Sequence, residues 1–170
     1  MTRTALIRLA VLLLPAAILR AGEPEKAPPA KAAERASAHP LWDGKETVAQ
    51  YAAKVKLEPQ IAFDLGLGVK MDLVLVPAGK FIMGSPKDER DREYDETQHE
   101  VTITKPFYMG KYEVTQEQYE QLIGRSPVVS KIEKGAKRPV TAVTWEDAVM
   151  YCLKLGQKVR RDVRLPTESE

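Results

Sequence analysis

The apolar residues of this chain of 170 residues change their period along the sequence, and this change most constrains the fold. Near the start, apolar side chains recur at helical spacing behind a potential N-cap at Thr47, which predicts a short helix that ends before Pro59. The residues at this spacing are Val48, Tyr51, Ala52 and Val55. A helical period here and a strand period further on predict a domain that mixes helices with strands.

The next segment has the two-residue period of β-strands. Met71, Leu73 and Leu75 alternate with their neighbours, and the run ends at Pro77-Ala78-Gly79, which predicts a strand that leads into a turn. A second strand over residues 80–84 would complete a hairpin with the first. After a charged loop over residues 86–98, the alternation of residues 101–104 and the β-prone run 107–114 predict further strands.

Two helices follow, each with a start signal. Thr115 and Gln118 have capping-box spacing, and Gly124 supplies the stop. Thr144 precedes a second helical pattern that is predicted to end at Gly156. The residues between the two helices form a loop rich in Lys, Pro and Ser. The sequence therefore favours the α+β class.

The chain ends on a helix start signal, because Thr167 and Glu170 again have capping-box spacing directly after Pro166. Since domains seldom finish where a helix begins, this pattern predicts that a longer domain is truncated here; the alternative is an accidental T-x-x-E. Truncation would leave apolar strand faces around Leu73 and Ile82 uncovered, together with the face around Ile103. Such a chain is expected to be marginally stable and prone to aggregation.

The N-terminus is typical of exported proteins. Residues 1–22 combine Arg3 and Arg8 with an apolar run over residues 9–19 that is too short to span a bilayer, which predicts a signal peptide cleaved near Ala21 or Gly22. The alternative is an uncleaved amphipathic anchor. Residues 23–40 are rich in Pro and Ala without large apolar side chains, so they are expected to form an extended tether. Residues 41–68 then form an N-terminal extension that contains the first short helix.

Overall composition belongs to the globular class, with 44% hydrophobic and 29% charged residues. Without the predicted signal peptide and its three arginines, the chain carries 23 basic and 24 acidic residues. That balance gives no electrostatic basis for binding nucleic acid, and no membrane association is expected after the signal is removed.

Four segments occur in an order that resembles the formylglycine-generating enzyme, or sulfatase-modifying factor, family. They are V-P-A-G-K-F-I-M-G-S (76–85), P-F-Y-M-G-K-Y-E-V-T-Q-E-Q-Y (106–119), P-V-T-A-V-T-W-E-D-A-V-M-Y-C (139–152) and R-L-P-T-E-S-E (164–170). The resemblance implies that residues 69–170 are the N-terminal part of that family's domain. It also implies the family's variant of the C-type lectin-like fold, an α+β domain with irregular loops, truncated here.

The residues that carry the resemblance are family landmarks to which the sequence assigns no catalytic, cofactor-binding or metal-binding role. They are Gly79, Met83, Gly84, Glu113, Thr115, Trp145, Cys152, Arg164, Leu165, Pro166, Thr167 and Glu168. Packing and charge pairing explain Glu113 and Trp145 equally well.

The resemblance implies an activity that these residues cannot perform alone. Active family members oxidise a sulfatase cysteine to Cα-formylglycine with oxygen and with copper held by two cysteine thiolates, so copper and a sulfatase polypeptide are implied for an active full-length protein. This chain has one cysteine and lacks the pair, which leaves enzymatic activity undecided. One hypothesis is therefore the N-terminal portion of an exported oxidase. The other is a non-catalytic exported binding module on the same scaffold.

Three further features have a structural and a functional interpretation. The spacing places Cys152 on an apolar helix face, which favours an inert buried thiol. The alternative, which the family resemblance implies, is a disulfide with a cysteine further along the chain. The alternation of Asp91, Glu93 and Asp95 is like the start of a calcium loop. However, Glu96 stands where that loop needs glycine, which favours a solvated charged loop. The two histidines, at 39 and 99, lack neighbours for a triad or a zinc site.

Overall fold

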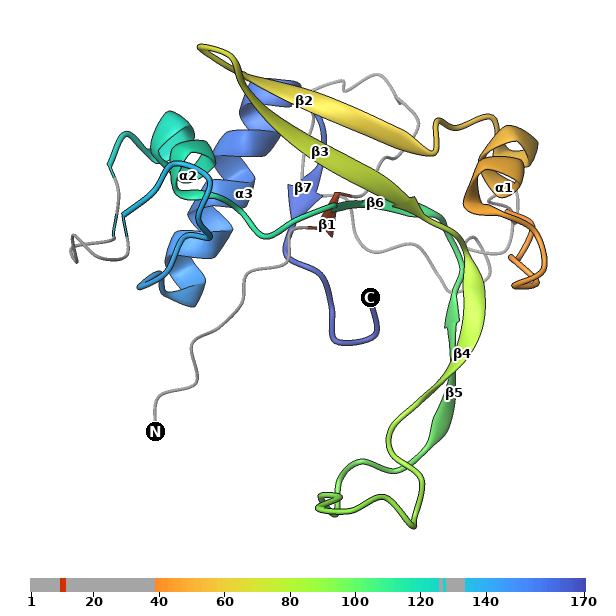
Figure 1. The fold of residues 1–170 in the computed structure, drawn as a ribbon. Coiled ribbons are helices and arrows are strands. Elements are labelled where there is room, and N and C mark those ends of the chain that lie inside the picture. Colours follow the sequence, from red (N-terminus) through yellow and green to blue (C-terminus); the bar gives the residue numbers. More distant parts are fainter. Residues whose placement is uncertain (1–9, 12–38, 126, 128–133) are drawn as a thin grey trace, which may run out of the picture.

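A computed structural model describes residues 39–125, 127 and 134–170, together with the backbone of residues 10–11 (Figure 1). The elements of these ranges, in chain order, are β1 (Ala10–Val11), α1 (Val48–Val55), β2 (Gln60–Gly66), β3 (Val69–Val76), β4 (Gly79–Met83), β5 (His99–Ile103), β6 (Phe107–Gly110), α2 (Gln116–Ile123), α3 (Trp145–Val159) and β7 (Val163–Arg164). The predicted tether, apart from residues 39–40, lies outside the described residues, as does most of the predicted signal peptide.

The central sheet is antiparallel, with the strand order β2-β3-β6-β1-β7. Its short strand β1 belongs to the stretch in which a signal peptide is predicted, so this pairing describes the chain with that stretch still attached. The mixture of helices with an antiparallel sheet is the α+β class that the sequence predicts.

The core lies on one face of the sheet. Alternate residues of β2 and β3, such as Phe63 and Leu73, point to this face, where the three helices contribute further buried side chains. From the helices these include Tyr51 of α1, Tyr119 of α2 and Tyr151 of α3, and the rings of Tyr119 and Tyr151 stack at 5.7 Å between centroids. Figure 1 shows α2 and α3 at one end of β2 and β3, with α1 at the other end.

The helix starts predicted at Thr47, Thr115 and Thr144 are confirmed, whereas the signal at Thr167 begins a turn within the described residues. Thr47, Thr115 and Thr144 are N-caps, and each forms a complete capping box with the residue three positions later. The stop at Gly124 is also confirmed, because this residue caps α2 in the left-handed conformation. The predicted stop of the third helix is wrong, since α3 continues past Gly156 to Val159.

Gly156 has a different role, which explains that error. A Cβ atom on this residue would lie 2.8 Å from the carbonyl oxygen of Arg161, so the glycine lets the returning chain approach the helix closely. The amide N–H of Arg161 donates to the Gly156 carbonyl over 3.1 Å. The glycine therefore serves tertiary packing, and helix termination falls to Arg160 in the left-handed conformation.

The predicted hairpin of residues 71–76 with residues 80–84 is also wrong. Both edges of β3 are occupied, by β2 and by β6, and β4 pairs with β5 instead. The β4–β5 pair, which we call the ribbon, continues the β3–β6 pair past Pro77 and projects away from the sheet (Figure 1). An apolar alternation sets which face a strand buries, but it does not select the partner strand.

Strand β2, which the sequence analysis did not predict, lies within the N-terminal extension. It joins β3 through a tight turn at Leu67 and Gly68, both with positive φ. Together with the helices it leaves Leu73 fully buried, so the expectation of an uncovered face at Leu73 is wrong. The expectation of an uncovered apolar face is confirmed at Ile82 on the ribbon, whose side chain is 60% exposed.

Candidate functional site

The base of the ribbon forms one wall of a cavity of about 400 Å³, which we call the ribbon cavity. Its floor includes Val76 and Phe107, which are paired neighbours on the sheet face opposite the helices. Trp42 closes one side, and residues 168–170 form the wall that faces the ribbon. Three segments that are far apart in the sequence therefore meet around one hollow.

One face of the ribbon supplies the apolar wall. The register pairs Gly79 with Ile103 and Phe81 with Val101, so these side chains share a face, and Met83 follows on the same side. Phe81 lines the cavity and is 42% exposed. Exposed apolar surface at a concave site is typical of a binding surface.

Two glycines shape the ribbon. At Gly84, φ is +99° and an added Cβ would lie 2.7 Å from the carbonyl oxygen of Thr97, so only glycine fits where the strand ends. Gly79 lies against Trp42, whose amide N–H donates to the Ala78 carbonyl over 2.7 Å. Of the family landmarks, Gly79 and Met83 therefore line the cavity, and Gly84 shapes the far end of β4.

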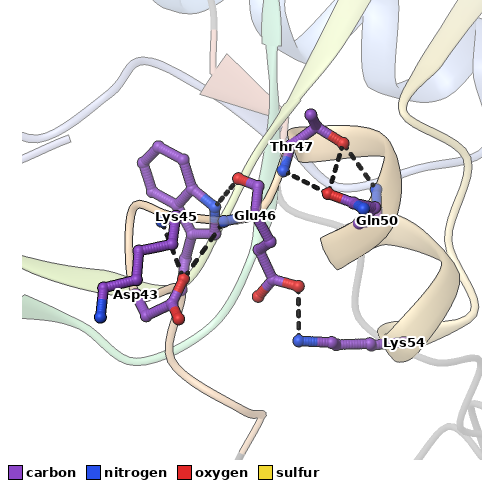
Figure 2. A network of polar contacts seen from close by, with 7 residues as sticks. Asp43, Lys45, Glu46, Thr47, Gln50 and Lys54 are labelled. Atoms are coloured by element: carbon purple, nitrogen blue, oxygen red, sulfur yellow. Dashed lines mark hydrogen bonds and ion pairs between the residues drawn. The ribbon is translucent and has the colours of Figure 1, made fainter.

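Figure 2 shows a polar network of residues at the start of α1, and this network positions Trp42. Its indole Nε1–H donates to the Glu46 carbonyl over 2.8 Å, and the Asp43 carboxylate accepts the amide N–H groups of Lys45 and Glu46. These backbone hydrogen bonds lower the pKa of Asp43. An ion pair of 2.5 Å between Lys54 and Glu46 ties the turn to the helix and raises the pKa of Lys54.

The chain end forms the opposite wall through a second polar cluster. Arg164 donates to both carboxylate oxygens of Glu170, over 2.7 and 2.6 Å, and this pairing holds the pKa of Glu170 down at about 2. The amide and hydroxyl of Thr167 also donate to Glu170. Residues 167–170 thus form a closed turn with capping-box contacts, beside which the exposed carboxylate of Glu168 borders the cavity.

The remaining family landmarks lie elsewhere. Glu113 and Thr115 line a second, more open cavity of about 750 Å³, and Thr115 also caps α2. Trp145 begins α3 and is 69% exposed, so packing in the core does not explain why this position holds a tryptophan. Leu165 packs against the core, and Pro166 follows it before the turn.

Cys152 is buried within α3, with 2% of its surface exposed, and burial raises the pKa of its thiol to about 12. It lies in the core cluster with Tyr151 and Leu155. These surroundings match the interpretation of a small buried hydrophobe.

The charged loop at the ribbon tip is solvated. Asp91 forms an ion pair with Arg90 at 3.8 Å, with both side chains more than 90% exposed, and Arg92 donates to the carbonyl of Ser85. Within the part of the chain that the structure describes, no three His, Cys, Asp or Glu side chains gather as a metal site would require. None of the described helices is long and apolar enough to cross a membrane.

With the fold and the cavity defined, comparison with known proteins identifies the class. Residues 68–170 match the family described as "Sulfatase-modifying factor enzyme 1-like domain", well over half of the chain. The chain belongs to this family. Its fold is accordingly the α+β, C-type lectin-like variant that the sequence resemblance implies.

Individual relatives match only part of their length. The chain is 43% identical over 84 residues to a protein named "Chaperone protein LppX" from Paenibacillus barcinonensis, which covers 49% of this chain and 26% of that relative. The structure of PvdO from Pseudomonas aeruginosa superposes with a TM-score of 0.50 at 27% identity, covering 62% of this chain and 46% of that one. The Treponema denticola variable protein 1 gives a TM-score of 0.49 at 25% identity, with 59% and 36% coverage. The chain thus spans about a quarter of the length of the curated relative.

Sequence reasoning missed two contributors to the ribbon cavity, Trp42 and Phe107. Nothing near Trp42 in the sequence indicates that it meets Gly79, because that contact joins segments 37 residues apart. Phe107 was predicted to lie in a strand, but its place in the cavity, on the face opposite the helices, depends on its pairing with Val76.

Proposed function

We propose that this chain is the polypeptide-binding part of an exported member of the sulfatase-modifying factor family, and that residues 1–170 bind without performing chemistry. The observation that carries the proposal is the ribbon cavity, where a half-exposed apolar face with Phe81 lines a hollow bordered by Glu168. A relative with 43% identity is named a chaperone protein, and chaperones act on polypeptides. Apolar concave surface with a charged rim suits that kind of ligand.

The chemistry of the side chains supports a binding role over catalysis. A Cu(I) site made of two thiolates needs two accessible cysteines, and the chain has one. That thiol is buried in α3 with a pKa of about 12, so it remains protonated at neutral pH. The residues of this chain therefore do not fit the copper site that the family resemblance implies.

A pair of adjacent substitutions on the ribbon tests this proposal. Phe81 faces the cavity and Ile82 faces away, and both are substantially exposed, so each tolerates a polar residue. Phe81→Ser is expected to weaken binding of labelled apolar peptides about tenfold, whereas Ile82→Ser leaves it unchanged. Fluorescence anisotropy measures both. Equal affinities in the two variants would place binding elsewhere.

A second candidate function follows from the family match itself. If the full gene product supplies two copper-binding cysteines, this chain is the N-terminal portion of a formylglycine-generating oxidase, with a sulfatase polypeptide as its partner. The full product with copper and oxygen would then convert the cysteine of a C-x-P-x-R peptide to an aldehyde, detected as a loss of mass. Residues 1–170 alone are expected to produce none, because one packed thiol cannot form that site.

Export is part of the proposal and has its own test. The charged and apolar residues of the first 22 positions support a cleaved leader. N-terminal sequencing of secreted protein should begin near Ala21 or Gly22. Material that begins at Met1 would instead indicate a retained segment.

A further inference from the structure

We propose that the free edge of β4 binds an extended polypeptide segment as an added strand, with an apolar side chain of that segment in the ribbon cavity and basic side chains beside it. This inference rests on the proposed function and adds the binding mode and the chemistry of the ligand. It comes from three observations: the backbone groups of β4, the position of Trp42, and the charges around the cavity.

The outer edge of β4 carries unused hydrogen-bonding groups. In an antiparallel pair, alternate residues direct both backbone groups away from the partner strand. The Ala78 carbonyl faces outward because it accepts from Trp42, so Lys80 and Ile82, two and four positions later, belong to the same outward set. Among the described residues, no strand pairs with β4 on this side beyond Gly79.

The protein itself begins such a third strand. Trp42 forms a parallel bridge with Gly79, after which the chain turns away at Asp43 and enters α1. A parallel bridge at Gly79 engages the outward groups on either side of it, the Ala78 carbonyl and the N–H of Lys80, so the edge is open from the Lys80 carbonyl onward, over Ile82. An incoming segment would continue along β4 from the point at which Trp42 leaves it, as in strand addition to an exposed sheet edge.

The ribbon cavity would accept alternate side chains of the added strand. Successive side chains of a strand point to opposite faces, so every second one would lie on the face that carries Phe81 and Met83. That face borders a volume of about 400 Å³, enough for a large apolar side chain. Backbone pairing would supply general affinity, and the cavity would select the apolar residue.

Charge identifies the flanking residues of the ligand. The loop at the ribbon tip, residues 87–96, holds six acidic and three basic side chains, a net charge of −3. At the other end, Glu168 is exposed beside the cavity and belongs to none of the ion pairs found among the described residues. Negative charge at both ends of the β4 edge favours a segment with lysine or arginine around its apolar residue.

Two proline variants test the edge. Ile82→Pro removes an outward N–H from β4, and Thr102→Pro is the matched control, because Thr102 pairs with Lys80 and points its backbone to the outer edge of β5. The probe is a fluorescein-labelled peptide in which Lys alternates with Val and Leu, titrated against the full chain. We expect Ile82→Pro to weaken binding about tenfold and Thr102→Pro to leave it unchanged.

Two further peptides test the same edge on wild-type protein, so their results do not depend on whether the proline variants fold. The same peptide with alternate amides N-methylated cannot donate to the edge and is expected to bind wild-type protein about tenfold more weakly. A peptide with Glu in place of Lys should lose binding by a similar factor, and this loss should shrink at high salt.

The outcomes separate the two proposals. If wild-type protein binds no peptide, the proposed function fails. If it binds but the proline variants and the N-methylated peptide behave like their controls, strand addition is wrong while peptide binding stands. Equal weakening by both proline variants overturns the assignment to the β4 edge. A dimer of the free protein that Ile82→Pro dissolves would assign this edge to a second copy of the chain and would also overturn the proposal.

Discussion

The N-terminal extension and the ribbon form an instructive contrast. Residues 41–66 precede the family match, yet they supply α1, an edge strand of the sheet and the fully buried side chain of Tyr51. The ribbon lies inside the family match, yet it leaves the sheet and keeps Phe81 and Ile82 substantially exposed. A match to the family model therefore does not identify the packed part of this molecule; buried contacts do.

The two regions differ physically in how many other helices and strands pack against them. The extension packs against β3, and the Tyr51 hydroxyl accepts the amide N–H of Ala78 over 3.2 Å, which ties α1 to the base of the ribbon. The ribbon has two strands, and among the described residues no helix or further sheet packs on its apolar face, where Phe81 is 42% exposed. Isolated two-stranded ribbons are marginally stable, so we expect the ribbon to open locally before the sheet does.

The largest expected effect tests whether the extension is integral. Tyr51→Ala removes a fully buried ring and should lower the free energy of unfolding by about 3–5 kcal/mol. Phe81→Ala on the ribbon is the matched control and should cost under about 1 kcal/mol, because much of its ring is already in water. Urea unfolding measures both. Similar losses in the two variants would mean that the regions do not differ as described.

An intermediate effect is expected within the ribbon. Gly84→Ala places a methyl group 2.7 Å from the Thr97 carbonyl oxygen at a positive φ, which should cost about 1–3 kcal/mol. Gly44→Ala in the extension also has a positive φ but meets nothing within 4 Å, so its cost reports backbone strain alone. Amide exchange should show the Gly84 effect confined to β4 and β5. Exchange that rises throughout the sheet would show that ribbon and body unfold together.

The smallest effect concerns the wall opposite the ribbon and depends on pH. The folded pKa of Glu170 is lowered from 4.5 to about 2, so its contribution to stability is fully present above pH 4.5 and is lost as pH falls toward 2. With solvent screening around the half-exposed Arg164, we expect about 1–2 kcal/mol. Glu170→Gln should therefore lower stability at pH 6 and change it little at pH 2.

Glu168→Gln is the control for this pH dependence, since Glu168 is exposed and lies outside the cluster of Arg164 and Glu170. Unfolding midpoints at pH 6, 4 and 2 give the comparison. A pH profile for Glu170→Gln that parallels the wild type would rule out this ion pair as the source.

Local chemistry explains which elements could be predicted from the sequence. Each capping box lies within four residues of chain, so Thr47, Thr115 and Thr144 mark the helix starts without reference to the rest of the fold. Strand β2 was within reach as well. Ile61, Phe63 and Leu65 alternate with polar or small residues, and this pattern with Gly66 and Gly68 is a hairpin signal.

The amino-acid sequence by itself determined the helix starts, the strand-forming runs and the family landmarks, because these depend on neighbouring residues or on a fixed order of motifs. Tertiary structure alone decided that β4 pairs with β5, that α3 passes through Gly156, and that Trp42 meets Gly79 at the ribbon cavity. Alternation fixes the face that a strand buries, but partners are chosen by contacts between distant segments. The candidate binding site consists of such contacts, and for that reason it appears only in the folded chain.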